Sequence, residues 1–311
     1  MANITSQMVK ELREMTQAGM MDCKKALVEA EGEMEKAIEW LREKGLAAAA
    51  KKAGRIAAEG AVIDYVTEDK TVGAIVEVNC ETDFVANTDN FKNFCKNIAK
   101  HIALSNPVDV DELMNQKFVD DESKTITDLV SDATVSIGEK ISIRRFARYQ
   151  TNCGVVETYI HMGGKIGVLV NLAVEGIDAA KVTELGKDVA MQIAAMNPAF
   201  LDKSDVSQET LDKEKEIQLA MMANDPKMAA KPEKVKEGIV MGKLGKYYEE
   251  NCLLQQAFVK ENKISVEKHV AAVAKELGGQ ITVKAFTRFA TGEGIEKKED
   301  DFAAEVASMI H

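Results

Sequence analysis

The chain has 311 residues, 46% of them hydrophobic, which is enough for two or more folded domains with cores of their own. Its 51 acidic and 40 basic side chains give a net charge of -11, which disfavours nucleic-acid binding, and no basic patch with interleaved aromatic residues offsets it. No apolar run approaches the ~20 residues of a membrane span, and the start lacks the basic-then-apolar order of a signal peptide. We expect a soluble, cytoplasmic protein that binds no membrane and keeps its five scattered cysteines reduced.

The first 45 residues carry apolar side chains at helical spacing in three short stretches, which Gly19, Gly32 and Gly45 separate. This pattern predicts three short helices. The small, basic and helix-permissive segment Gly45–Arg55 is typical of a connector, and β-branched runs begin after it. We therefore predict an N-terminal three-helix domain at residues 1–56, called the head below.

An internal repeat follows the head. GAVIDYV from Gly60 resembles GVVETYI from Gly154, and GAIVEVN from Gly73 resembles GVLVNLA from Gly167, both at an offset of 94 residues. Two further matches follow: IAKHIALSNP with VAMQIAAMNP at an offset of 91, and ISIRRFARY with ITVKAFTRF at 140. The pattern in each copy predicts two strands, a helix that ends at Asn-Pro, a further helical stretch and a third strand.

The repeat predicts an α+β fold with two related core subdomains, each an antiparallel sheet with helices on one face. We assign copy one to residues 57–150, and copy two to residues 151–200 and 251–290. A C-terminal module at residues 291–311 completes the chain. Its tail predicts a helix with one apolar face formed by Phe302, Val306, Met309 and Ile310.

The rise in offset from 91 to 140 means that copy two contains 49 extra residues after Pro198. They predict a helical hairpin at residues 201–250, with one amphipathic helix from Ser207 to Ala223, a turn at Asn-Asp-Pro, and a second helix from Glu233 to about Glu250. A projecting hairpin cannot bury both of its faces alone. Docking through self-association and a solvated arm are both open alternatives.

The fall in offset from 94 to 91 means that copy one is three residues longer between strand and helix, in the polar stretch VNCETDFVANTDNF. We expect a loop here, with Phe84 displayed outward beside Asp83. An inward Phe84 that anchors the loop is the alternative.

Met20 and Met21 form a second candidate contact at a helix corner, unless they fill the core of the head. The tail helix is the third, unless it packs on its own domain.

The sequence contains no recognisable motif for catalysis or for cofactor binding. The four histidines lack metal-site spacing, and no phosphate-binding glycine motif is present, so we expect no metal, no cofactor and no direct nucleotide binding. Cys80 and His161 could act as nucleophile and base, but Cys80 continues a strand and favours a buried, structural thiol.

The segments MTQAGMMDCKKAL (Met15–Leu27) and EVNCETDFVAN (Glu77–Asn87) resemble the two signatures of the bacterial elongation factor Ts family. The resemblance covers essentially the whole chain. It implies a head similar to ubiquitin-associated domains, and an inserted hairpin that dimerises in some members. It also implies that the chain is not an enzyme but a guanine-nucleotide exchange factor. Such a factor binds elongation factor Tu with GDP and promotes GDP release so that GTP can bind.

The resemblance also implies roles for single residues. Thr82, Asp83, Phe84 and Val85 would enter the partner and disturb its magnesium and phosphate site. The positions that would contact the partner elsewhere are Arg13, Met20, Met21, Lys24, Ile137, Gly138, His161, Val259 and Met309. The segment HMGGKIG, which begins at His161, is one residue longer than the usual family form between the histidine and the following strand.

Two rival functions remain open. In the first, the head is a ubiquitin-like or peptide-binding adaptor and the repeats are a scaffold. In the second, Cys80 makes the chain a hydrolase. A homodimer or a two-to-two complex through the hairpin is a further open alternative.

Overall fold

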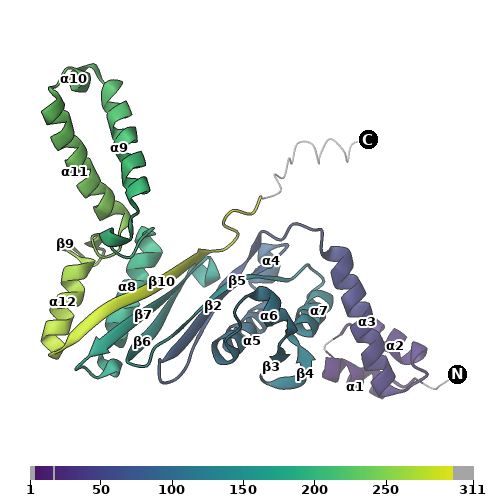
Figure 1. Cartoon of the computed structure of the whole chain (residues 1–311). Helices are drawn as coiled ribbons and strands as arrows, with labels where there is room; N and C mark the ends of the chain where they lie inside the picture. Colours follow the sequence, from purple (N-terminus) through teal and green to yellow (C-terminus); the bar gives the residue numbers. More distant parts are fainter. Residues whose placement is uncertain (1–3, 17, 297–311) are drawn as a thin grey trace, which may run out of the picture.

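The computed structural model describes residues 4–16 and 18–296 (Figure 1). The chain is α+β, with antiparallel sheets of strand order β1-β2-β5 and β10-β7-β6, as the repeat predicts. The predicted C-terminal helix lies outside the described residues. In the described part, no helix is both long enough and apolar enough to cross a bilayer.

The head contains the three predicted helices: α1 (Ser6–Thr16), α2 (Met20–Glu29) and α3 (Met34–Lys52). Leu12, Cys23 and Leu27 are fully buried between them. The helix-permissive connector from Gly45 is helical for most of its length, because α3 continues to Lys52. Alanine and lysine favour helix strongly enough to offset one interior glycine, which costs about 1 kcal/mol.

Copy one packs its helices against one face of its sheet, around the buried Phe91, Ile98 and Ile102. Its elements in chain order are β1 (Glu59–Val66), β2 (Val72–Cys80), α4 (Asp83–Ala86), α5 (Asp89–Ser105), α6 (Val110–Asn115), β3 (Lys117–Phe118), β4 (Asp121–Thr125), α7 (Ile126–Ile137) and β5 (Ser142–Gln150).

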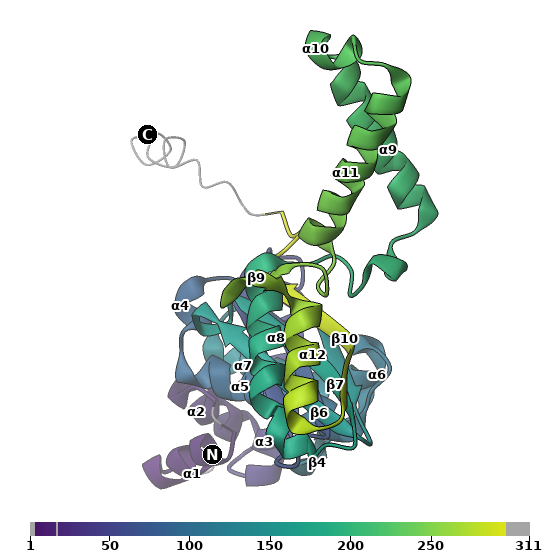
Figure 2. The same cartoon turned by 90° about the vertical axis from the view of Figure 1, so that its left-hand side faces the viewer.

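Copy two repeats the order of the long strands, the two long helices and the short hairpin, although residues 252–256, in the place of α6, form no helix. Figure 2 shows α8 and α12 side by side over its sheet. Its elements are β6 (Gly154–His161), η1 (Met162–Gly164), β7 (Ile166–Glu175), η2 (Ala179–Val182), α8 (Thr183–Met196), η3 (Lys203–Asp205), β8 (Ala257–Phe258), β9 (Glu261–Ser265), α12 (Val266–Leu277) and β10 (Gln280–Ala290).

The Asn-Pro pairs end equivalent helices in the two copies. Asn106 follows α5 with φ 50° and Asn197 follows α8 with φ 46°, both in the left-handed conformation that asparagine tolerates. The predicted helix ends are therefore confirmed. The short hairpins β3-β4 and β8-β9 were not expected, since strands of two and five residues carry little periodicity.

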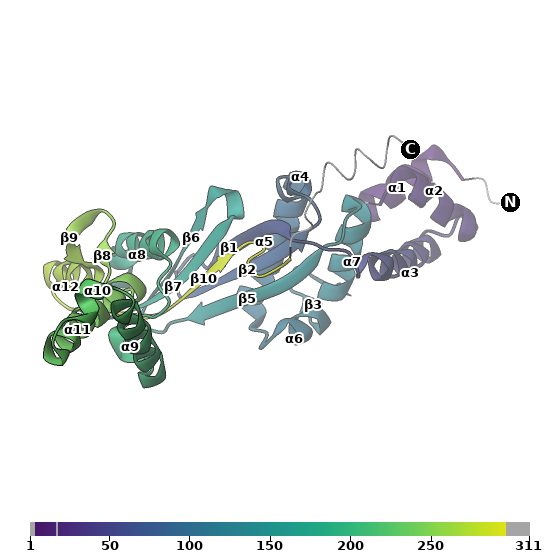
Figure 3. The ribbon, with the colours of Figure 1, turned by 90° about the horizontal axis from the view of Figure 1, so that it is seen from above.

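The two sheets lie face to face, with the helices on their outer faces (Figure 3). Val62 and Ile75 of copy one pack between the sheets against Val156 and Leu169 of copy two, and Phe289 closes the cluster. The core therefore has four layers in the order helices, sheet, sheet, helices. Each sheet packs its own helices on one face and the other sheet on the opposite face.

The insertion is a helical hairpin that projects from copy two, away from the head (Figures 1 and 2). It comprises α9 (Gln208–Ala223), α10 (Pro226–Ala229) and α11 (Glu233–Asn251), close to the predicted bounds. Ser207 caps α9 by accepting the Thr210 N–H. A parallel bridge between Phe200 and Cys252 joins its two ends at the base. The hairpin thus leaves the core through one narrow attachment.

Candidate functional site

The stretch predicted as a loop is a single helical turn, α4, and Phe84 stands on it with 82% of its surface exposed. We call residues Thr82–Ala86 the Phe84 turn. Thr82 caps it, because its hydroxyl accepts the Val85 N–H at 3.3 Å. The outward orientation of Phe84 is confirmed, and the inward alternative is wrong. An exposed phenylalanine on an ordered turn is a candidate contact for another molecule.

The loop prediction fails because the extra residues of copy one are helical. α5 and α8 end at equivalent asparagines, and at the offset of 91 the first turn of α5, residues 89–91, corresponds to residues 180–182 of η2. The three additional residues of copy one therefore lie before α5, in the stretch that contains α4. Val85 packs against the core of copy one, and Ala86 is buried. These two side chains fix one side of the Phe84 turn and leave Phe84 on the other.

Glu139, which sequence reasoning missed, holds the base of the Phe84 turn. Its carboxylate accepts the backbone N–H groups of Glu81 and Thr82, both at 3.0 Å, and the Thr82 hydroxyl at 2.6 Å. In return the Glu81 carboxylate accepts the Lys140 N–H at 2.6 Å. We call these four bonds the Glu139 clamp. It joins the segment after β2 to the segment before β5.

Ile137 and Gly138 lie directly before this clamp. Ile137 ends α7, and Gly138 follows in the left-handed conformation with φ 89°. The carbonyl of Gly138 accepts the Lys52 ammonium at 2.6 Å, which ties the end of α3 to the same place. The structure therefore brings Thr82–Val85 and Ile137–Gly138 together, as two of the predicted contact segments.

Arg13, Met20, Met21 and Lys24 line one groove of about 500 Å³ on the head. Met20 is 59% and Met21 72% exposed, so the alternative that they fill the head's core is wrong. Methionine side chains at an exposed groove are flexible and polarizable, which suits them to packing against another protein.

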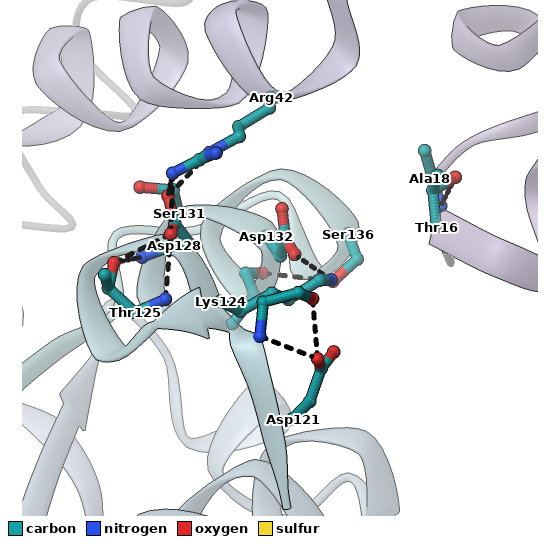
Figure 4. Close-up of polar contacts among 12 residues, drawn as sticks. Thr16, Ala18, Arg42, Asp121, Lys124, Thr125, Asp128, Ser131, Asp132 and Ser136 are labelled. Atoms are coloured by element: carbon teal, nitrogen blue, oxygen red, sulfur yellow. Dashed lines mark hydrogen bonds and ion pairs between the residues drawn. The ribbon is translucent and has the colours of Figure 1, made fainter. Parts of the chain in front are cut away.

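The head is fixed to copy one by an ion pair between Arg42 on α3 and Asp128 on α7. The guanidinium reaches Asp128 with two hydrogen bonds of 2.8 Å, as Figure 4 shows. Burial alone would raise the pKa of Asp128, but hydrogen bonds from Thr125 and Arg42 outweigh it and hold that pKa below its usual value. The bidentate pair orients the head groove relative to copy one.

A second buried carboxylate, Glu77, fixes the place where the C-terminal segment begins. It accepts the Gly292 N–H at 2.8 Å, Arg144 Nη1 at 3.0 Å and Arg145 Nε at 2.6 Å. Arg145 also stacks over the ring of Phe289, with 4.4 Å between guanidinium and ring centroid. Gly292 and Glu293 are therefore held against copy one, whereas Thr291 still donates to the carbonyls of Lys165 and Gly164 in copy two.

The remaining predicted contacts lie elsewhere. His161 ends β6, and its Nδ1 shares a 3.0 Å hydrogen bond with the Tyr159 hydroxyl. Val259 lies in the β8-β9 turn and is 44% exposed, while its N–H donates to Gln192 Oε1 at 2.8 Å. Met309 lies outside the described residues.

The thiol chemistry that the sequence left open has no support in this geometry. Cys80 is buried and donates to the Thr82 carbonyl at 3.1 Å, and burial raises the pKa of its thiol to about 12. A thiol that stays protonated at neutral pH is a poor nucleophile. Across residues 4–16 and 18–296, no group of three or more histidine, cysteine or acidic side chains could hold a metal ion.

Comparison with known proteins decides the family. A family model described as Elongation factor TS matches residues 81–293. Elongation factor Ts of Clostridium kluyveri (strain NBRC 12016) is 54% identical over 307 residues, and that of Clostridium botulinum (strain Loch Maree / Type A3) is 52% identical over 308; both matches cover 99% of either chain. The chain belongs to the elongation factor Ts family. It is therefore a translation elongation factor, and the resemblance to this family is confirmed.

Proposed function

We propose that this chain is a cytoplasmic guanine-nucleotide exchange factor that binds elongation factor Tu with GDP, disturbs its magnesium and phosphate site, and promotes GDP release so that GTP can bind. The family name supports the choice of partner. The observation that carries the proposal is the 82% exposed ring of Phe84 on a turn whose base is hydrogen-bonded on both sides.

Exchange by this route needs no covalent step. A factor that binds the nucleotide-free partner more tightly than the nucleotide-bound partner must weaken nucleotide binding by the same factor. We propose that the Phe84 ring packs into the partner beside its nucleotide site, and that the Asp83 carboxylate competes there with the phosphates for their cationic partners, magnesium included. Thr82 and Val85 would set the position of both side chains.

One phenylalanine cannot account for the whole effect. Burying its ring is worth roughly 1.5 to 3 kcal/mol, or about one to two decades in an equilibrium constant. We therefore propose that the other contacts supply much of the binding free energy. These contacts are the head groove with Arg13, Met20, Met21 and Lys24, the end of α7 with Ile137 and Gly138, and His161, Val259 and Met309.

We propose that the working units follow the ranges set out above: the head at 1–56, similar to ubiquitin-associated domains, copy one at 57–150, copy two at 151–200 and 251–290, the hairpin at 201–250 and the C-terminal module at 291–311. The hairpin is the proposed surface for self-association, as a homodimer or in a two-to-two complex, because Ile217, Met221 and Met241 are exposed on it. Sedimentation of the free protein, with and without residues 208–251, tests this part.

Release of a fluorescent GDP from elongation factor Tu tests the main proposal. The wild-type chain should accelerate release, and Phe84→Ala should lose most of the acceleration while keeping its unfolding temperature. Val108→Ala is a matched control, because Val108 is 81% exposed on the same copy without a proposed contact. Release at the wild-type rate with folded Phe84→Ala would contradict the role of the ring.

A further inference from the structure

The Phe84 turn has only four helical residues, too few to be stable by themselves in water. The exposed side of the turn adds no packing that would stabilise it, since Phe84 projects into solvent. Its shape therefore depends on what holds its base. The side chains of Asn87 and Thr88 hold its C-terminal end by donating to the carbonyls of Asp83 and Val85. Besides the buried Ala86 and the packed Val85, the Glu139 clamp holds its N-terminal end.

Glu139 acts on the turn through Thr82. The Thr82 hydroxyl donates to Glu139 Oε1 at 2.6 Å, so its lone pairs are left free to accept the Val85 N–H. Glu139 Oε2 takes the two backbone N–H groups that precede the turn. Hydrogen bonds to an ionised carboxylate are about twice as strong as those between neutral groups. The carboxylate therefore fixes the direction in which the chain enters the turn.

Copy two is an internal comparison. At the offset of 140 the residue equivalent to Glu139 is Gly279, and at the offset of 94 Thr82 corresponds to Gly176. Copy two has an ordinary 3-10 connection here, η2, and no exposed aromatic residue. A Cβ on Gly279 would collide with the backbone carbonyl of Glu175, so no carboxylate can enter there. The clamp therefore occurs in copy one, which exposes Phe84, and cannot form at the equivalent place in copy two.

We propose that Glu139 is a positioning residue for exchange: it holds the Phe84 turn in the orientation that enters the partner, and so sets the rate of GDP release without touching the nucleotide site. This inference rests on the proposed function. A side chain that must insert beside a nucleotide loses effect steeply when its orientation is no longer fixed.

The test compares Glu139→Gln with Phe84→Ala and the double variant in fluorescent GDP release. We expect Glu139→Gln to lower the maximal rate about tenfold while the half-saturating concentration stays within about twofold, because the other contacts are intact. In the Phe84→Ala background the same substitution should have no further effect. Asp120→Asn, which removes an exposed carboxylate paired with Lys100 at 2.8 Å on the same copy, is the control and should match wild type.

Amide hydrogen exchange of the free protein provides a readout that needs no partner. Exchange across residues 82–87 should rise in Glu139→Gln and stay unchanged in Asp120→Asn. If exchange rises but Phe84→Ala releases GDP at the wild-type rate, the clamp is right and the proposed function is wrong. If Phe84→Ala is slow but Glu139→Gln is not, or if the two effects multiply, the positioning role is overturned.

Glu139→Asp provides a second test of the proposal in case the glutamine variant misfolds. It keeps the negative charge but shortens the side chain by one methylene, so it should also slow release because it no longer reaches Thr82. A wild-type maximal rate in Glu139→Asp would overturn the proposal, since charge alone would then suffice.

Discussion

Gly73 and Gly167 stand at equivalent places in the two copies, and each leaves room for a valine of the opposite sheet. A Cβ on Gly73 would lie 2.6 Å from Cγ1 of Val156, and a Cβ on Gly167 would overlap Val62. Val62 and Val156 are separated by the same 94 residues as the two glycines. The contact between the sheets is therefore made twice, once in each direction, as in a symmetric interface.

Alanine at either glycine should destabilise the chain. The added methyl must push the valine or the sheets apart, and overpacking of this kind costs about 1 to 3 kcal/mol. The free energy of unfolding from urea titration checks this. Gly242→Ala on α11 is the control: nothing lies within 4 Å of its Cβ position, and alanine there should stabilise the hairpin by up to ~1 kcal/mol. An unchanged free energy in Gly167→Ala would contradict the close packing described above.

Glu77 should make the stability of the chain depend on pH in the acid range. Burial alone would raise the pKa of Glu77, but the Gly292 N–H, Arg145 and Arg144 outweigh it and lower that pKa. A folded-state pKa below the unfolded value of about 4.3 contributes stability that is complete above that value and is lost as the pH falls through the folded pKa.

Glu77→Gln removes this contribution and leaves two arginines short of a partner. It should cost about 3 kcal/mol or more at neutral pH, the usual penalty for breaking a buried ion pair. The difference in unfolding free energy from wild type should shrink as the pH falls from about 4.3 through the lower folded pKa, because the wild-type carboxyl becomes protonated over this range. Urea titrations across this range check it, and a constant difference would count against the ion pairs as its source.

Thiol labelling should distinguish Cys153 from the other cysteines. Cys153 is exposed, whereas Cys23, Cys80, Cys95 and Cys252 are buried, and burial raises the pKa of the Cys80 thiol to about 12. At neutral pH a soluble disulfide reagent should modify one thiol quickly in the folded protein and all five in denaturant. Cys153→Ser should abolish the fast reaction. Rapid labelling of Cys80 would revive the hydrolase alternative.

Met21→Ala should weaken binding to elongation factor Tu without changing the fold. Because Met21 is 72% exposed, its truncation should alter the unfolding free energy by no more than about 0.5 kcal/mol. Loss of a methionine from the head groove should cost about 1 kcal/mol of binding. Calorimetric titration measures the affinity, and Met15→Ala, exposed on the same head but outside the groove, serves as the matched control. Equal affinities for all three proteins would exclude the groove as a contact.

Local signals in the sequence predicted most elements. Periodicity gave the head and the helices of the insertion, and the Asn-Pro pairs fixed the ends of α5 and α8. The Phe84 turn was mistaken for a loop because four helical residues carry no periodicity. The Glu139 clamp joins groups 57 to 59 residues apart along the chain, and such a pairing follows from the sheet rather than from any local pattern. Its one visible trace was the exchange of Gly279 for Glu139 between the copies.

The continuity of α3 has a consequence for how several contacts combine. Since the helix runs unbroken to Lys52 and is bound by Arg42 to Asp128, the head groove and the Phe84 turn keep a fixed separation. A partner engaged at one of them meets the other at a high effective concentration, and little further rotational freedom is lost. A flexible linker in place of residues 45–55 would keep every contacting side chain. It would lower the effective concentration at which the second contact forms after the first.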